Sequence, residues 1–320
     1  AQLEGSKVFA KDLMKKYNIP TAAYGVFHKV DEAKAFIAQT GAPIVVKADG
    51  LAAGKGVVVA MTIDEANVAV EDMLSGNRFG DAGSTVVIEE FMEGEEASLL
   101  AFVDGKTVVP MIASQDHKRI FDGDKGPNTG GMGTYAPAPV LTDALRDEAM
   151  KTILEPMVAA MEKEGMPYVG CLYAGLMITD EGPKVVEFNA RFGDPETQVV
   201  LPLLDSDLGE IMMACAKGTL TSNMVKWKDS SAACVILASK GYPETSSKGD
   251  VISGDIKQYD TTIVFHSGTK LVGENYVTNG GRVLGVVGLG KDLRTALDRA
   301  YERIEHIDFE GMQYRTDIGA

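Results

Sequence analysis

A glycine-rich segment between two apolar runs is the first feature of this sequence that could perform chemistry. Residues 47–56 read Lys-Ala-Asp-Gly-Leu-Ala-Ala-Gly-Lys-Gly, and short strands are predicted on either side, at 43–48 and 57–60. Glycines let backbone amides approach a polyphosphate closely, and lysines neutralise its charge. The spacing is one residue short of a Walker loop and no Ser or Thr follows the lysine, which excludes a P-loop NTPase. In isolation, the segment is equally typical of a β-hairpin with a flexible tip.

Acidic side chains follow the next predicted strand, at residues 85–90. Residues 89–96 read Glu-Glu-Phe-Met-Glu-Gly-Glu-Glu. Carboxylates that emerge from an apolar strand into a closed cleft can accept hydrogen bonds from an adenine amino group or from ribose hydroxyls, and their burial without such donors is costly. The alternative is a solvated acidic turn, which is the commoner fate of such a run.

A third group of polar residues ends another predicted strand. Because side chains alternate along a strand, Glu187, Asn189 and Arg191 are expected on one face. A carboxylate and an amide oxygen side by side suit Mg²⁺, and an adjacent guanidinium could hold a phosphoryl group during its transfer. The alternative is a surface ion pair between Arg191 and Asp194 or Glu196.

Residues 114–139 are rich in Gly, Pro, Asn, Asp and Thr and show little apolar periodicity. Residues 116–119 read Asp-His-Lys-Arg, and residues 126–133 read Gly-Pro-Asn-Thr-Gly-Gly-Met-Gly. Adjacent cations followed by a turn with free backbone amides predict an anion-binding concavity. His117 has no Cys or second His nearby, so we predict a structural or hydrogen-bonding role for it.

Composition limits the possible partners and the setting. The 320 residues include 31 Lys and Arg against 46 Asp and Glu, which gives a net charge of −15 and argues against a broad nucleic-acid footprint. The longest apolar runs fall far short of the ~20 residues that span a bilayer, so no membrane association is expected. The three cysteines show no Cys-x-x-Cys spacing and lie in apolar stretches, which predicts buried thiols in a reducing cytoplasm.

The elements that must position these residues alternate between helices and short strands. Ser6 and Asp64 are predicted N-caps, Pro156 is predicted to break a helix, and Asp104-Gly105 marks a hairpin. Helices are predicted at 6–17, 31–39, 64–74, 142–163, 206–217 and 292–305. Further strands are predicted at 97–103, 107–112, 172–178, 184–189, 232–239, 262–267 and 282–289.

The order of these motifs resembles the ATP-grasp superfamily. Within it, the strings LEGSK, VVKADGLAAGKGV, IEEFMEGEEAS, SQDHKR, GPNTGGMGTYAPAP and EFNARFGDPETQ resemble the glycinamide ribonucleotide synthetase family, and the likeness runs from Leu3 to about Gly319. The resemblance implies an α+β fold in which two lobes sandwich ATP, here residues 1–221 with a mobile lobe at about 20–92, followed by a small β-rich domain at 222–320. That family carries a further domain ahead of LEGSK, so we expect a missing N-terminal domain in cis.

The same resemblance implies roles for individual residues. The ATP site comprises phosphate-binding lysines, the glycine-rich loop 49–57, adenine-binding residues and a ribose-binding carboxylate, namely Lys7, Lys47, Gly50, Gly54, Lys55, Gly56, Glu89, Met92 and Glu96. Glu187 and Asn189 would bind Mg²⁺ or Mn²⁺. The site for glycine and 5-phosphoribosylamine comprises the residues with implied catalytic roles, Arg191, Lys118 and Asp116, and the substrate-binding residues Thr129, Gly130, Gly131 and Asp194.

The implied reaction is the ATP-dependent joining of glycine to 5-phosphoribosylamine in purine biosynthesis, through glycyl phosphate. Such phosphoryl transfer needs mainly positioning and charge neutralisation, which lysines, an arginine and Mg²⁺ supply. Two alternatives stay open on the sequence: a catalytically incomplete ATP-binding fragment of that enzyme, and another ATP-grasp carboxylate–amine ligase. The SQDHKR and GPNTGGMG strings count against the second.

Overall fold

The structure is a computed structural model that describes residues 2–50, 56–75 and 84–320, and it divides into two compact units. Unit 1 comprises Ala1–Pro110, Val140–Arg191 and Met212–Leu220, and unit 2 comprises Met111–Pro139, Phe192–Ile211 and Thr221–Ala320. Both units combine helices with antiparallel sheets, so the prediction of an α+β protein is confirmed. The boundary at residues 221–222 and the mobile lobe at about 20–92 stay predictions.

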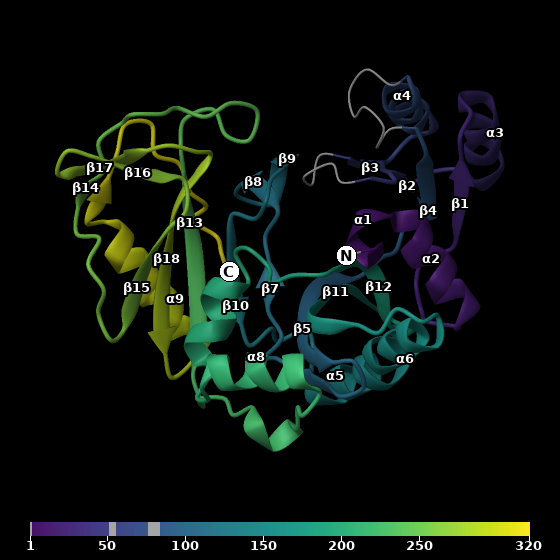
Figure 1. The fold of residues 1–320 in the computed structure, drawn as a ribbon. Coiled ribbons are helices and arrows are strands. Elements are labelled where there is room, and N and C mark those ends of the chain that lie inside the picture. The colour runs from purple at the N-terminus through teal and green to yellow at the C-terminus, as the bar shows by residue number, and fades with distance from the viewer. Residues whose placement is uncertain (1, 51–55, 76–83) are drawn as a thin grey trace. The chain divides into compact units, whose positions relative to one another are not determined.

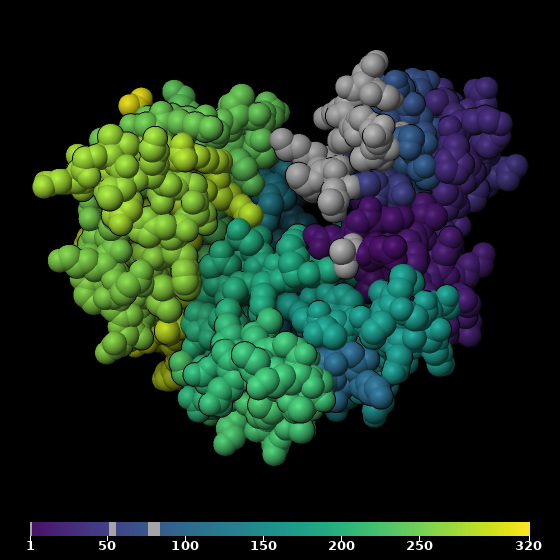
Figure 2. Space-filling view, in the orientation of Figure 1, coloured from purple at the N-terminus to yellow at the C-terminus, as the bar shows by residue number. Residues whose placement is uncertain are grey.

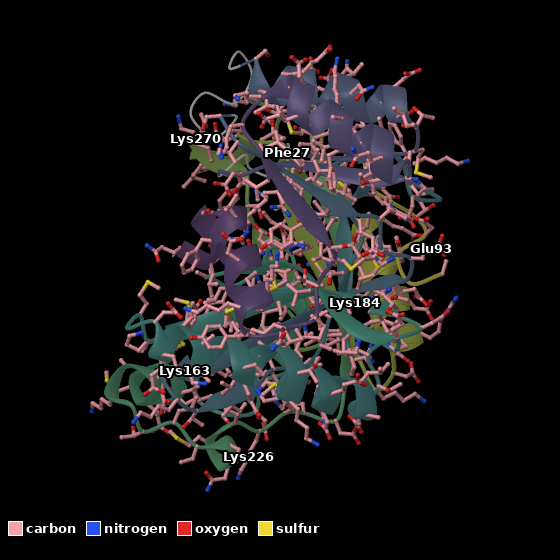
Figure 3. The ribbon with its side chains drawn as sticks, turned by 90° about the vertical axis from the view of Figure 1, so that its right-hand side faces the viewer. Phe27, Glu93, Lys163, Lys184, Lys226 and Lys270 are labelled. Atoms are coloured by element: carbon pink, nitrogen blue, oxygen red, sulfur yellow. The ribbon has the colours of Figure 1, made fainter. Side chains whose placement is uncertain are left out.

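Unit 1 contains two four-stranded sheets. The first has the order β1-β4-β2-β3, and α3 and α4 pack side by side against one of its faces (Figure 1). Phe27 of β1, labelled in Figure 3, contacts the ring of Phe36 in α3 with 5.1 Å between centroids. In the space-filling view the purple and blue atoms of these elements form a continuous lobe (Figure 2). The elements are β1 (Tyr24–Phe27), α3 (Val30–Thr40), β2 (Ile44–Ala48), β3 (Val57–Ala60), α4 (Ile63–Leu74) and β4 (Val86–Glu90).

The second sheet of unit 1 has the order β12-β11-β5-β6. Lys184 of β12 is labelled in Figure 3. The predicted hairpin at Asp104-Gly105 is confirmed, since β5 pairs with β6 and the Asp104 carboxylate accepts hydrogen bonds from the Lys106 and Thr107 amides. The elements are α1 (Gln2–Gly5), α2 (Lys7–Lys16), β5 (Glu95–Asp104), β6 (Val108–Pro110), α5 (Asp143–Ala149), η2 (Met150–Leu154), α6 (Glu155–Lys163), β11 (Val169–Thr179) and β12 (Gly182–Asn189).

Unit 2 is built on a five-stranded sheet of order β15-β18-β13-β10-β7, against which α9 packs (Figure 1). Its central strand β13 is buried at every position, as the apolar run at 232–239 predicts. The elements are β7 (Gln115–Asp116), β8 (Arg119–Phe121), β9 (Lys125–Asn128), β10 (Gly133–Ala136), α7 (Thr197–Val200), η3 (Leu201–Leu203), η4 (Ser222–Met224), β13 (Ser231–Ala238), β14 (Ser253–Gly254), β15 (Thr262–His266), β16 (Thr269–Val272), β17 (Asn275–Thr278), β18 (Arg282–Gly290), α9 (Leu293–Ile304) and β19 (Ile307–Asp308). Helix α8 (Leu208–Lys217) crosses from unit 2 into unit 1.

The local structure differs in detail from the predicted elements at three places. Thr62, not Asp64, caps α4: it forms a capping box with Glu65, and Asp64 lies in the first helical turn. The segment 114–139 is not a plain loop but contains the short strands β7 to β10, whose polar, glycine-rich sequence hides any alternation. The predicted break at Pro156 is not a true break, because residues 143–163 are helical throughout; the irregularity is the π-helical turn η2, which directly precedes α6.

The capping box yields a stability prediction. The Thr62 hydroxyl accepts from the Glu65 amide at 3.2 Å, and the Glu65 carboxylate accepts from the Thr62 amide at 3.3 Å. We expect Thr62→Ala to destabilise α4 by about 1 kcal/mol. The Glu65 amide loses its hydrogen-bond acceptor, and the Glu65 carboxylate is held less firmly against the amide of residue 62. Hydrogen exchange of the α4 amides measures this, with Thr62→Ser as the matched control that keeps the hydroxyl. Equal exchange in Thr62→Ala and wild type would show that the cap contributes nothing.

Candidate functional site

A buried carboxylate held by two lysines forms the centre of the candidate site in unit 1. Glu89, near the end of β4, is 2% exposed, and its Oε2 atom lies 3.0 Å from Lys11 Nζ and 2.9 Å from Lys47 Nζ. Lys47 also donates to the Val186 carbonyl at 3.1 Å and thereby links β2 to β12. Two lysines and one glutamate leave an excess positive charge at this point, which suits an anionic ligand.

The second oxygen of Glu89 is the more informative one. Glu89 Oε1 is buried and has no hydrogen-bond partner within residues 2–50, 56–75 and 84–320. A buried carboxylate oxygen without a donor is costly, so its presence indicates a donor that arrives with a ligand. The exocyclic amino group of adenine is such a donor.

Lys11 is a site residue that sequence reasoning missed. It lies on α2 one turn after Lys7, is 2% exposed, and donates to the Thr21 hydroxyl at 2.8 Å as well as pairing with Glu89. Burial lowers the pKa of Lys11 to about 8, against the opposing effect of Glu89. The i, i+4 spacing of two lysines on one helix was the available signal, but surface helices carry the same pattern routinely.

Lys7 lies at the first turn of α2, where the predicted N-cap Ser6 is confirmed. The Asp49 carboxylate accepts from the Val8 amide at 2.8 Å and from the Ser6 hydroxyl at 3.1 Å, so the glycine-rich segment is fastened to this helix end. Lys7 Nζ donates to the Gly50 carbonyl at 3.2 Å. Burial lowers the pKa of Lys7, and Glu187 is the largest of the nearby charges that oppose this shift.

Glu187 and Asn189 share one face of β12, as alternation predicts. Asn189 is 8% exposed, and its Nδ2 atom lies 3.4 Å from Glu187 Oε1. An amide can be turned over without changing its shape, which would present its oxygen beside the carboxylate. The described part of the chain holds no group of three or more His, Cys, Asp or Glu placed to bind a metal. A carboxylate plus one amide fits Mg²⁺, which takes few protein ligands and completes its shell with phosphates and water.

Arg191 follows β12 and pairs with a residue near the chain start. Its Nε atom lies 3.0 Å from Glu4 Oε1, and the Ala190 amide donates to Glu4 Oε2 at 3.0 Å. The side chain is 54% exposed, which leaves guanidinium surface for a ligand. The alternative considered from the sequence was an ion pair with Asp194 or Glu196. The structure gives the Arg191 guanidinium a partner in Glu4, which lies 187 positions away in the chain and could not be predicted from local sequence.

The remaining predicted nucleotide residues lie along the connection between β4 and β5. Met92 is partly buried in the four-residue link, and Glu96 is exposed near the start of β5. Gly94 approaches the Ile178 carbonyl so closely that a Cβ atom would lie 2.2 Å from its oxygen, so this turn requires glycine. Gly56 accepts from the Ala48 amide through its carbonyl at 2.8 Å. Gly54 and Lys55 lie outside the described residues.

Unit 2 brings together most of the residues predicted for the small substrates. Asp116 of β7 pairs in register with Thr134, and a Cβ atom on Gly131 would lie 2.7 Å from the Asp116 carboxylate. The Lys118 carbonyl accepts from the Thr129 amide at 2.7 Å and the Thr129 hydroxyl at 2.8 Å. The Thr129 hydroxyl in turn accepts from the Gly131 amide at 3.0 Å.

Arg282, at the start of β18, is a second residue that sequence reasoning missed. Its guanidinium donates to the carbonyls of Gly130 at 2.7 Å and Asp194 at 2.9 Å, and lies 3.3 Å from the Asp194 carboxylate. The arginine therefore fixes the glycine turn against residue 194. It stands 152 positions after Gly130, and nothing in its own surroundings in the sequence signals the contact.

The expectation of free backbone amides at the glycine turn is wrong. The Thr129 and Gly131 amides donate to the partners given above, and the Gly130 amide donates to the Tyr242 hydroxyl at 2.9 Å. An anion at this turn would have to be held by side chains. His117 contacts the Tyr135 ring at 5.5 Å between centroids, and burial lowers its pKa, so the ring is neutral at pH 7.

Two family models match successive parts of this chain. Residues 5–197 match the family described as "Phosphoribosylglycinamide synthetase, ATP-grasp (A) domain", and residues 232–320 match "Phosphoribosylglycinamide synthetase, C domain". A phosphoribosylamine–glycine ligase of Neisseria meningitidis serogroup A is 55% identical over 99% of this chain and 76% of its own length.

Solved structures show the same fold. A phosphoribosylamine–glycine ligase from Thermotoga maritima superposes with a TM-score of 0.90 at 37% identity, over 99% of this chain and 79% of that one. The biotin carboxylase domain of Hydrogenobacter thermophilus 2-oxoglutarate carboxylase has a TM-score of 0.75 at 17% identity, over 97% of this chain and 67% of that one. The prediction of an ATP-grasp fold is confirmed.

The depressed pKa of Lys11 predicts how stability depends on pH. In the folded chain Lys11 loses its proton near pH 8, whereas in the unfolded chain it does so near its usual 10.5. Between these values the unfolded state binds more protons, so this residue makes stability rise with pH. We expect the urea midpoint of wild type to rise relative to that of Lys11→Met from pH 8 to 10.5. Lys15→Met, on the same helix, is the control; parallel pH profiles for wild type and Lys11→Met would refute the assignment.

Proposed function

Because the chain belongs to the phosphoribosylglycinamide synthetase family, we propose that it is an ATP-dependent ligase that joins glycine to 5-phosphoribosylamine in purine biosynthesis. The products are glycinamide ribonucleotide, ADP and phosphate. The chain covers 76% of the length of the Neisseria relative.

We assign the nucleotide to the Glu89 cluster of unit 1. The observation that carries this assignment is the buried Oε1 atom of Glu89, which has no hydrogen-bond partner in the described part of the chain and fits the amino group of adenine. The backbone near Met92 would complete the adenine contacts, and Glu96 would accept from the ribose hydroxyls. Lys7 and Lys47 would hold the phosphates. The loop at 49–57, which includes Gly50, Gly54, Lys55 and Gly56, would lie over them.

Glu187 and Asn189 are the proposed ligands of Mg²⁺ or Mn²⁺. When bound, the ion neutralises phosphate charge and fixes the phosphate geometry. Lys7 lies close enough to Glu187 for the two charges to affect each other, so a lysine and the metal ligands would meet the same polyphosphate. Arg191, oriented by Glu4, would add positive charge where the γ-phosphoryl group is transferred.

The proposed chemistry has two steps. A glycine carboxylate oxygen attacks the γ-phosphorus, the bond to the β-phosphate oxygen breaks, and ADP leaves with the displaced electron pair. The amine of 5-phosphoribosylamine then attacks the carbonyl carbon of glycyl phosphate, inorganic phosphate departs, and the nitrogen loses a proton. Acyl phosphates hydrolyse readily, so excluding water is essential to the yield.

The small substrates are assigned to unit 2. Asp116 and Lys118 are the proposed ionic contacts for the ammonium group of glycine and the phosphate of 5-phosphoribosylamine. Thr129, Gly130, Gly131 and Asp194 would shape the same surface, held in place by Arg282. No helix of the described residues is long and apolar enough to cross a bilayer. All three cysteines are buried and free, which supports a cytoplasmic setting.

ADP release from Mg-ATP tests the function directly. We expect ADP to form at a substantial rate when glycine and 5-phosphoribosylamine are both present, because the second step consumes the glycyl phosphate that the first step forms. Each substrate alone and an alanine-for-glycine exchange are the controls. Nucleotide binding without ADP release would favour the incomplete ATP-binding fragment, and release with another carboxylate would favour a different ATP-grasp ligase.

The metal assignment has its own test. Glu187→Gln keeps the shape but removes one charge from the metal ligands, so we expect ligase activity to fall by about a hundredfold or more, and the Mg²⁺ concentration for half-maximal rate to rise. Glu181→Gln is the control, since that exposed carboxylate lies in the turn before β12 and pairs with Lys184 of that strand. A Mg²⁺ dependence that is unchanged in Glu187→Gln would remove the assignment.

A further inference from the structure

Arg315 is almost completely buried although it lies five residues before the last residue described. Its side chain is 2% exposed and forms hydrogen bonds with three other residues. The guanidinium donates to both Asp317 oxygens at 2.7 and 2.8 Å, to Asp124 at 2.6 Å and to the Arg119 carbonyl at 3.3 Å. A buried arginine with this many charge-assisted hydrogen bonds holds its surroundings in one arrangement.

Residues 315–317 contact the turn of the β8–β9 hairpin. Each of the three turn residues, Asp122, Gly123 and Asp124, contacts a residue of the segment 315–317. Thr316 donates to the Asp122 carboxylate through its amide at 2.8 Å, and the Gly123 amide donates to Asp317 at 2.7 Å. The hydrogen bonds from Arg315 hold the pKa of Asp317 well below its usual range, so this carboxylate is charged at neutral pH.

The hairpin needs such support. Residues 121–128 are all exposed, and Asp124 has a φ of 51°, in the left-handed region where few residues other than glycine are found. Ile120 is 4% exposed and packs with Met132 and Ala238, which fixes the base of the hairpin but not its turn. Beyond the pairing of β8 with β9, the turn is held by its contacts with residues 315–317.

The hairpin also leads into the residues assigned to the small substrates. Lys118 and Thr129 close its base through the two hydrogen bonds to the Lys118 carbonyl. The Thr129 hydroxyl continues to the Gly131 amide at 3.0 Å, and Gly131 packs against the Asp116 carboxylate. Burial, and next the charge of Arg315, lower the pKa of His117, which lies between Asp116 and Lys118. A displacement of the hairpin would therefore reach Lys118 and Thr129, which adjoin its two strands.

We infer that Arg315 is a positioning residue for the small-substrate site, acting on Lys118 and Thr129 through the turn of the β8–β9 hairpin. The inference rests on the proposed function, because the roles of Lys118 and Thr129 belong to that proposal. Arg315 itself need not touch a substrate. The geometry predicts that loosening the turn impairs the use of glycine and 5-phosphoribosylamine but not that of ATP.

Asp124→Gly is the sharpest test. Glycine accepts the left-handed backbone, so the change removes the carboxylate without adding strain, and Arg315 keeps its two bonds to Asp317. We expect kcat/KM for 5-phosphoribosylamine and glycine to fall about tenfold, with KM for ATP within about twofold of wild type. The Gly123 and Thr129 amides should exchange hydrogen faster. Asp124→Asn, which tolerates the same backbone and can still accept from Arg315, should restore much of the activity.

The controls separate this inference from the proposed function. Lys125→Ala changes the exposed residue directly after the turn, at the start of β9, and removes none of the contacts between residues 122–124 and 315–317, so it should behave as wild type. An active wild type with unchanged kinetics or unchanged exchange in Asp124→Gly would overturn the positioning role alone, as would an equal rise in KM for ATP. A wild-type chain without glycine-dependent ADP release would overturn the proposed function and this inference with it.

Discussion

The charge balance around Glu89 is the constraint on which unit 1 depends. Two buried lysines from different elements, α2 and β2, converge on one carboxylate oxygen of Glu89, whose side chain is 2% exposed. Removing one member of such a buried group typically costs about 3–5 kcal/mol, because the others keep an uncompensated charge. The remaining oxygen has no partner among the residues that the structure describes, which indicates that the cluster was not built for stability alone. It tolerates a cost that a ligand can remove.

This arrangement also couples the two sheets of unit 1. Lys47 reaches from β2 to the Val186 carbonyl on β12, one residue before the proposed metal ligand Glu187. Thr21 and Pro20 bond to Val185 on the same strand at 2.7 and 2.8 Å. Groups that would contact adenine, phosphate and metal are therefore connected through one strand. A ligand that draws Lys47 away from Glu89 would weaken the link to β12 at the same time.

The sequence predicted the local elements well because their causes are local. Ser6 caps α2, Asp104-Gly105 turns a hairpin, and the apolar run of β13 is buried, since each depends on neighbours within a few residues. Thr62 was missed as a cap because Asp64, two residues on, has the same chemical signature. The strands within 114–139 were missed because pairing there is satisfied by partners such as β13, far along the chain.

The candidate site was predictable only where a family resemblance or a compact motif carried it. Such motifs contain Lys47, Glu187 and Asn189. They do not contain Lys11, Arg282 and Arg315, although each of these forms a hydrogen bond or ion pair with a predicted site residue or with its neighbour in sequence. Arg315 and Asp124 are 191 positions apart, and an isolated arginine near the end of a chain is ordinarily a solvated one. Burial and fixed geometry, not residue type, distinguish it. A buried arginine must direct its donors to partners that stay in place. One of the partners here, the Arg119 carbonyl, directly follows Lys118, a residue that we propose for the substrate site.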